Sequence, residues 1–123
     1  MNNSRFVIER SGNQFFFNLK AAGNSEIILT SERYTRKASA LEGIAAVKVC
    51  AAYPSQFRRR RSKRGESYFV LRGANGEVIG TSEMYSSAGA RETGIAAVQT
   101  HAPDASIEDQ TEPTLISFTT TLN

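Results

Sequence analysis

Apolar and polar positions along the chain follow two different periods. Phe6 and Ile8 alternate with Val7 and Glu9, and after the turn signal "SGN" the alternation resumes with Phe17 and Leu19. A Gly/Asn stretch then precedes the β-branched run "EIILTS". Alternation of period two, broken by turn residues, predicts three strands joined as a meander.

The period lengthens after Tyr34. Ile44, Val47 and Ala51 stand at i, i+3 and i+7, a narrow apolar stripe that predicts a helix packed by one side. Hydroxyl residues are good N-caps, and Thr35 is the first candidate here, as Ser86 is in the second copy.

A second copy of the whole pattern follows about 51 residues later. "TSERY" at 30–34 returns as "TSEMY" at 81–85, and "GIAAV" at 43–47 returns at 94–98. "FFNLK" at 16–20 matches "YFVLR" at 68–72 with a shift of one residue, which places an indel in the Gly/Asn turn. The repeated motif comprises Thr30, Ser31, Glu32, Tyr34 and Gly43 in the first copy and Thr81, Ser82, Glu83, Tyr85 and Gly94 in the second.

Gly43 and Gly94 each interrupt a predicted helix at the same place. A glycine there costs about 1 kcal/mol relative to alanine. We interpret the repeated cost as a close approach, of helix to sheet or helix to helix, where a Cβ would not fit. The alternative is that an old duplication left two unimproved glycines.

The two copies resemble the YegP-like family of small bacterial proteins over roughly residues 5–110. The resemblance rests on the strand, TSE, Tyr and helix signature in register. It implies an α+β fold in which two tandem β-β-β-α-β repeats form one antiparallel sheet, with both helices on one face and the C-terminal strands exchanged between repeats. It also implies that the duplication is a fused dimer, so we expect a monomer with a pseudo-twofold axis. The family brings no activity, cofactor or catalytic residue with it.

One domain is expected over residues 1–123. Repeat 1 covers 5–54, repeat 2 covers 55–111, and a C-terminal extension follows at 112–123. Half of such a chain is too short to bury a sufficient core alone, so the copies are expected to share one core.

Composition and charge narrow the class of protein. With 40% hydrophobic and 22% charged residues the chain is typical of a globular domain, and it has neither a leader pattern nor a membrane-spanning stretch, so a cytoplasmic location is expected. The single cysteine, Cys50, allows no internal disulfide, and no Cys or His spacing fits a metal. The net charge of +3 divides into +7 for residues 1–102 and −4 for 103–123.

Six of the fifteen positive charges lie in "RRRRSKR", here called the basic run. On the strand pattern Arg59 takes the inward position of Ile8, which is costly unless a bulge, an edge location or pairing with Glu108 and Asp109 relieves it. Phe16 and Tyr68 fall at the same place on the non-helical face of their respective strands, where aromatic rings suit base stacking. The candidate binding residues are therefore Arg58, Arg59, Arg60, Arg61, Lys63, Arg64, Phe16 and Tyr68.

Three interpretations of the basic run stay open. Basic side chains on an edge strand block association between sheets and need no ligand. They also suit nucleic-acid phosphates, or an acidic protein partner that includes the chain's own tail.

No catalytic constellation is evident in the sequence. His101 stands alone near the end of the second helix, where a protonated imidazole suits the helix dipole. Ser31 with Glu32 and Ser82 with Glu83 are neighbours on strands and point to opposite faces, so they do not form a nucleophile and base. The expected function is a non-catalytic binding or interaction module of unknown partner, without cofactor or membrane contact. The alternative is nucleic-acid binding through the basic run.

Overall fold

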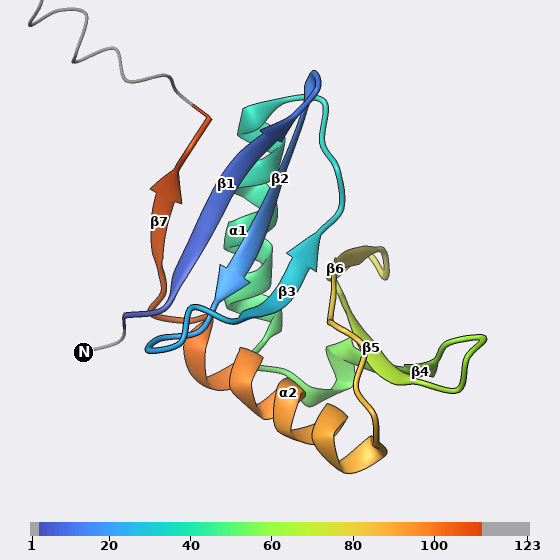
Figure 1. The fold of residues 1–123 in the computed structure, drawn as a ribbon. Helices are drawn as coiled ribbons and strands as arrows, with labels where there is room; N and C mark the ends of the chain where they lie inside the picture. The colour runs from blue at the N-terminus through green and yellow to red at the C-terminus, as the bar shows by residue number, and fades with distance from the viewer. Residues whose placement is uncertain (1–2, 112–123) are drawn as a thin grey trace, which may run out of the picture.

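The computed structural model describes residues 3–111, which form one seven-stranded sheet and two α-helices (Figure 1). This confirms the α+β class and the two helices. The extension at 112–123 lies outside the described residues. The elements in chain order are β1 (Arg5–Ser11), β2 (Gln14–Lys20), β3 (Ile27–Ser31), α1 (Lys37–Cys50), a 3₁₀ turn (Pro54–Gln56), β4 (Phe57–Arg61), β5 (Ser67–Arg72), β6 (Val78–Thr81), α2 (Ala88–His101) and β7 (Ser106–Asp109).

The sheet is mixed rather than wholly antiparallel. Its order is β4-β5-β6-β3-β2-β1-β7, and each neighbouring pair from β4 to β1 is antiparallel, but β7 runs parallel to β1. The expected antiparallel sheet is therefore wrong at this strand, because the chain returns from α2 to the end of the sheet where β1 begins (Figure 1). Exchange of C-terminal strands between the repeats is not shown: after α1 the described chain enters β4 through the 3₁₀ turn, with no strand between.

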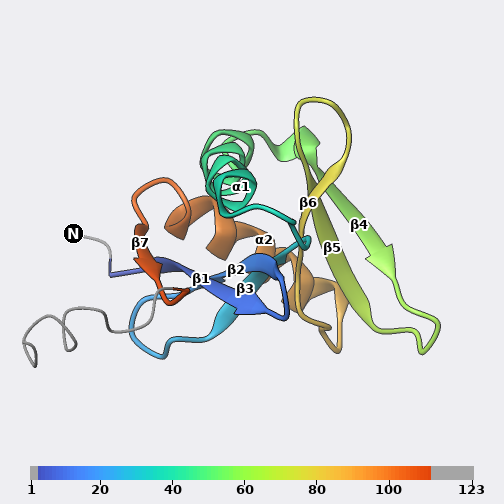
Figure 2. The same ribbon diagram turned by 90° about the horizontal axis from the view of Figure 1, so that it is seen from above.

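Both helices lie on the same face of the curved sheet and share one core with it (Figure 2). α1 packs on β2 of its own repeat and on β6 of the other, while α2 packs on β5 and on β3. The inward side chains of the strands, among them Phe6, Phe17, Leu19 and their counterparts Phe57, Phe69 and Leu71, are almost fully buried. Each helix thus covers part of both repeats, so neither repeat could bury its core alone.

The expected helix caps are wrong by one residue. α1 begins after Arg36, which makes no side-chain capping bond, and α2 begins after Ser87, whose hydroxyl accepts the Ala90 N–H at 3.0 Å. In both copies the residue after the motif tyrosine still belongs to the turn, so the cap falls one position later than Thr35 or Ser86.

The close approach expected at Gly43 and Gly94 is confirmed, and its partner is the motif tyrosine. A Cβ at Gly43 would lie 2.6 Å from the hydroxyl oxygen of Tyr34, and one at Gly94 would lie 2.2 Å from that of Tyr85. Each tyrosine ring also stacks on a core phenylalanine, Tyr34 on Phe17 with ring centroids 6.5 Å apart. In each copy the motif tyrosine and the helix glycine therefore form one contact, in which the helix crosses directly over the tyrosine ring.

The repeats meet at the pairing of β3 with β6, where Thr30 faces Thr81 and Ser31 faces Gly80. Leu29 and Gly80 occupy equivalent positions, 51 residues apart. A Cβ at Gly80 would lie 2.7 Å from two carbons of Leu29, which is itself fully buried. One leucine fills the space near the pseudo-twofold axis, and its counterpart must be glycine.

Replacing Gly43 with alanine tests the tyrosine contact. Helix propensity alone favours alanine by about 1 kcal/mol. We expect instead a net destabilisation of about 1–3 kcal/mol, measured by urea unfolding, because Tyr34 must move. Tyr34→Phe should restore much of the loss, since it removes the atom at 2.6 Å and leaves the next contacts at 3.1 Å.

The second repeat supplies the control for that experiment. At Gly94 a ring carbon of Tyr85, Cζ, would still lie 2.6 Å from the new Cβ, so Tyr85→Phe should not rescue Gly94→Ala. A Gly43→Ala variant as stable as the wild type would contradict this account.

The packing of Leu29 against Gly80 can be tested by a double-mutant cycle. Gly80→Ala should cost about 1–3 kcal/mol through overpacking, and Leu29→Ala about 2–5 kcal/mol through a cavity. Because the alanine at 80 would occupy part of that cavity, the double variant should lose at least about 1 kcal/mol less than the sum. Additive losses in urea unfolding would show that the two residues do not compete for one space.

Candidate binding edge

The first part of the basic run lies on β4, which forms one edge of the sheet. β4 pairs with β5 on one side, and within residues 3–111 no strand covers its other side (Figure 1). Phe57 is buried, whereas Arg58–Arg61 are all exposed. An edge position lets the long arginine side chains reach solvent, so the strand carries four positive charges without burying one.

The hydrogen bonds of β5 show which backbone N–H and C=O groups of β4 point away from the sheet. Ser67 exchanges N–H···O bonds of 2.9 and 2.7 Å with Tyr85, and the Phe69 carbonyl accepts from Ser82 N–H, so these odd residues of β5 face away from β4. Tyr68 and Val70 therefore bond Arg60 and Arg58, which lie opposite them. Because backbone groups alternate along a strand, the N–H and C=O of Arg59 and Arg61 point to the uncovered side, called here the β4 edge.

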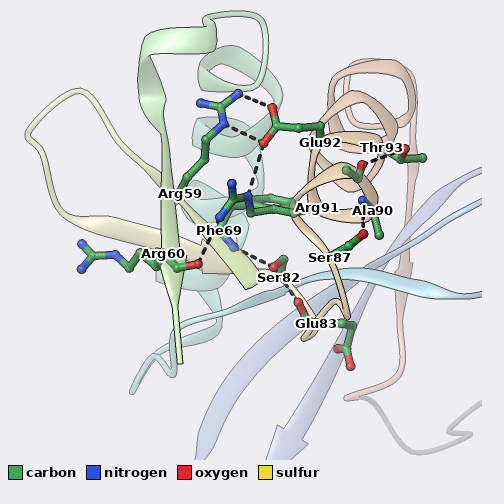
Figure 3. A network of polar contacts seen from close by, with 11 residues as sticks. Arg59, Arg60, Phe69, Ser82, Glu83, Ser87, Ala90, Arg91, Glu92 and Thr93 are labelled. Carbon is green, nitrogen blue, oxygen red and sulfur yellow. Dashed lines mark hydrogen bonds and ion pairs between the residues drawn. The ribbon is translucent and has the colours of Figure 1, made fainter. Parts of the chain in front are cut away.

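Arg59 does point toward the helical face, and Glu92 of α2 pairs with it. The Nε and Nη2 atoms of Arg59 lie 2.7 and 2.6 Å from the two carboxylate oxygens of Glu92, a bidentate pair (Figure 3). The hydrogen bond from Arg59 lowers the pKa of Glu92, and Arg91 adds to the effect. Pairing of Arg59 with Glu108 or Asp109 is wrong, because those residues lie on the opposite edge of the sheet.

The other arginines of β4 have no carboxylate partner within residues 3–111. Arg58 donates to the carbonyl of Ser55, and Arg61 donates weakly to that of Gly65 at 3.5 Å. The side chain of Arg60 leaves the strand on the side opposite to Arg59 (Figure 3). Lys63 and Arg64 extend the positive charge into the turn that follows β4.

Phe16 and Tyr68 are not brought together. Tyr68 lies opposite Arg60, but Phe16 is on β2, three strands away from β5, and its ring is covered by the guanidinium of Arg33 at 4.7 Å. β2 and β5 run in opposite directions, so the two aromatics are displaced in opposite senses from the centre of the sheet. Strand spacing and rise then separate them by roughly 20 Å.

The opposite edge shows how an acidic strand is held in this fold. Ser106 N–H donates to the Ser4 carbonyl at 3.1 Å and Gln110 N–H to the Ile8 carbonyl at 2.9 Å, so β7 binds the outward groups of β1. Glu108 forms an ion pair of 3.1 Å with Arg5. An acidic segment thus covers this edge through backbone bonds and charge together.

Asp109 completes the docking of β7. Burial raises its pKa, but hydrogen bonds from Lys37 and Thr111 outweigh that effect and hold the pKa at about 2. Pairing of these carboxylates with Arg59 was one of three alternatives open from the sequence, and the fold decides against it because β7 covers the opposite edge.

A partly apolar hollow of about 320 Å³ lies at the start of β4. It is lined by Val49 and Tyr53, both more than half exposed, together with Cys50, Ser55, Gln56 and Ala74. The sequence carried no signal for this hollow, because it forms between the end of α1, the 3₁₀ turn and the turn after β5.

The lone histidine contacts a serine that lies 97 residues away. Ser4 Oγ and His101 Nδ1 are 2.5 Å apart, and Ser4 Oγ also accepts the Ala22 N–H at 3.2 Å. Ser4 is fully buried, so this pair joins α2 to the start of β1. No local pattern connects residues so distant along the chain.

The motif serines are structural. Ser31 Oγ accepts the buried Phe17 N–H at 2.9 Å and donates to the Glu32 carbonyl at 2.7 Å, and Ser82 Oγ accepts the Phe69 N–H at 3.0 Å and donates to the Glu83 carbonyl at 2.8 Å.

A second cleft, of about 580 Å³, lies over Tyr34 and is lined by Glu32, Glu42 and Glu77 among others. Burial first, and Glu32 second, raise the pKa of Tyr34, so its hydroxyl stays protonated near neutral pH. Within the described part of the chain no cluster of His, Cys, Asp or Glu is arranged to hold a metal, and no helix is long and apolar enough to span a bilayer.

The duplicated fold and motif define a class of two-repeat α+β proteins with one shared sheet. The family model described as "Domain of unknown function (DUF1508)" matches the chain twice, at residues 11–56 and 62–109. The chain belongs to this family, known also as UPF0339 or YegP, and the resemblance seen in the sequence is confirmed.

Relatives from several bacteria share most of the chain. A UPF0339 protein of Bordetella pertussis is 52% identical over 107 residues, which cover 87% of this chain and 96% of the relative. YegP of Escherichia coli K12 is 46% identical over 101 residues, covering 82% and 91%. The solution NMR structure of E. coli YegP, a protein of unknown function, superposes with a TM-score of 0.86 at 41% identity and covers 93% of this chain and 98% of that one. These comparisons establish family and fold and do not assign an activity.

The lowered pKa of Asp109, on β7, predicts that the stability of the protein depends on pH. Because the folded pKa of Asp109 is about 2, below its ordinary value, its contribution is complete above roughly pH 4 and is lost as the pH falls toward 2. The wild type should therefore melt at a higher temperature than Asp109→Asn at pH 6, and the gap should close near pH 2. A gap that is constant from pH 6 to pH 2 would assign the effect to something other than the charge of Asp109.

Proposed function

We propose that this chain is a non-catalytic binding module whose binding surface is the β4 edge together with the rest of the basic run. One observation carries the proposal: an uncovered edge strand presents four exposed arginines, of which Glu92 matches only Arg59 within the described residues. An edge strand that only had to be protected from association with another sheet would need fewer charged residues than β4 has, since one or two lysines or a proline suffice. The surplus charge favours an anionic partner.

A non-catalytic role is supported by the surroundings of the reactive side chains. Ser4, the partner of His101, is fully buried, so no substrate carbonyl can reach its hydroxyl. Cys50 is also buried, and the motif serines are engaged by backbone amides. These groups stabilise the fold, which leaves the surface charges as the distinctive chemistry of the chain.

Nucleic acid is the competing partner, and the geometry gives it weaker support. Tyr68 stands beside Arg60 and suits one stacked base, but Phe16 lies roughly 20 Å away by strand spacing and cannot extend the same platform. The favoured partner is therefore an acidic protein segment.

Salt-dependent binding tests the surface itself. Fluorescent polyglutamate should bind at 50 mM salt and weaken strongly at 200 mM, and Arg58→Ser/Arg60→Ser/Arg61→Ser should reduce its affinity at least roughly tenfold. Fluorescence anisotropy measures each constant. Single-stranded RNA and duplex DNA are titrated in parallel, and a duplex that contacts three of these arginines would lose roughly 40-fold over the same range.

A charge-matched variant provides the control. Arg10→Ser/Arg33→Ser/Arg36→Ser removes three exposed positive charges elsewhere and should retain most of the affinity. If both triple variants lost the same affinity for polyglutamate, binding would depend on net charge alone, which would contradict a defined binding surface. Tighter binding of RNA or DNA than of polyglutamate would favour the competing partner.

A further inference from the structure

The two edges of the sheet are equivalent by the internal repeat, yet within residues 3–111 only one of them is covered by a further strand. β4 corresponds to β1 with an offset of 51 residues, so Phe57 matches Phe6 and Arg59 matches Ile8. β7 lies along β1, whereas nothing described lies along β4 (Figures 1 and 2). The described part of the chain therefore fills one of the two equivalent strand positions and leaves the other open.

The outward backbone groups of Arg59 and Arg61 offer an added strand the kind of bonding that β1 offers to β7. On β1 the carbonyls of Ser4 and Ile8 accept N–H groups of β7. Their counterparts are Ser55 and Arg59. Ser55 lies in the 3₁₀ turn and its carbonyl accepts from the Arg58 guanidinium, and the Phe57 N–H donates to the Pro54 carbonyl, so this end of the edge differs from β1. The Arg59 carbonyl belongs to the uncovered side of β4, and beyond the Phe57 N–H an added strand parallel to β4 would find the alternation of donors and acceptors that β7 finds on β1.

The hollow at the start of β4 lies where such a strand would enter. Its residues Cys50 and Ser55 correspond to His101 and Ser4, which meet at the place where the chain turns into β7. There Ala105 is buried immediately before Ser106 bonds to Ser4. The hollow is the counterpart, in the second repeat, of the place that buries Ala105. It could receive an apolar side chain that precedes the added strand.

Charge decides what kind of segment fits. Glu108 lies opposite Val7 on β1, so the matching residue of an added strand would lie opposite Arg58, and the residue two further on opposite Arg60. A second copy of β4 would instead place arginines against arginines, which is destabilising. Nucleic acid would use neither the backbone groups nor the apolar hollow.

We propose that the β4 edge binds an extended segment of a partner protein as an eighth strand, parallel to β4, with acidic side chains opposite Arg58 and Arg60 and an apolar residue in the hollow. This inference rests on the proposed function and specifies its partner and geometry. Arg59 is already neutralised by Glu92, so the partner residue between the two acids need not be charged.

The chain's own β7 supplies a suitable probe. The peptide has the sequence of residues 102–111 with Asp109→Thr and Gln110→Glu, so that two of its three acids, those at 108 and 110, fall opposite Arg58 and Arg60. Its binding to the full chain is followed by fluorescence anisotropy of a label on the peptide. On binding, the Arg59 and Arg61 amides should gain protection from hydrogen exchange, whereas those of Arg58 and Arg60 are already bonded to β5.

Two N-methylated peptides separate strand addition from simple charge attraction. In the β7 geometry the N–H at 108 points to the receiving strand and the N–H at 109 points away. Methylation at 108 should weaken binding at least roughly tenfold, and methylation at 109 should change it less than about twofold. Glutamine at both 108 and 110 should also abolish most of the affinity.

Each other outcome overturns the inference. Equal effects of the two methyl groups, or no peptide binding while polyglutamate still binds, would reject strand addition and leave the proposed function standing. Loss of polyglutamate binding as well would reject both. RNA binding without peptide binding would assign the surface to nucleic acid, and a dimer in light scattering that dissociates in Arg58→Ser/Arg60→Ser would assign the edge to a second copy.

Discussion

The packing of Leu29 against Gly80 is the contact on which the joined sheet depends. Two equivalent side chains cannot both occupy the space beside a twofold axis, and a Cβ at position 80 would lie 2.7 Å from Leu29. Two repeats in one chain can resolve this by keeping leucine in one copy and glycine in the other. The short pairing of β3 with β6, only two residue pairs long, can then close and align both halves.

Once the halves are aligned, the helices complete the core. α1 and α2 each pack on strands of both repeats, and each crosses over a motif tyrosine at a glycine. The tyrosine and the glycine lie nine residues apart in sequence but form one contact. The repeated motif is therefore explained by packing, because the helix can approach the tyrosine only where it has a glycine. It does not describe a reactive site, since its serines bond the buried amides of Phe17 and Phe69.

The same near symmetry makes the differences between repeats informative. Repeat 1 has Val7 and Ile8 on a strand that β7 covers, whereas repeat 2 has Arg58 and Arg59 on a strand that nothing within residues 3–111 covers. Glu92 and the edge location together remove the cost of the inward arginine, but exposed ion pairs are worth less than about 1 kcal/mol, so stability alone does not account for the run. Binding chemistry is the more economical explanation.

The sequence by itself determined the repeat, the three-strand meander, the helices and the special status of Gly43 and Gly94, because each depends on local periodicity or on a cost visible at one position. It also located the basic run that forms the candidate site. Only the tertiary structure decided that β7 joins β1 in parallel, that Arg59 pairs with Glu92, and that Ser4 meets His101. These contacts join residues 33 to more than 100 positions apart, and which ones form depends on the order of strands and the faces that helices cover rather than on any local pattern.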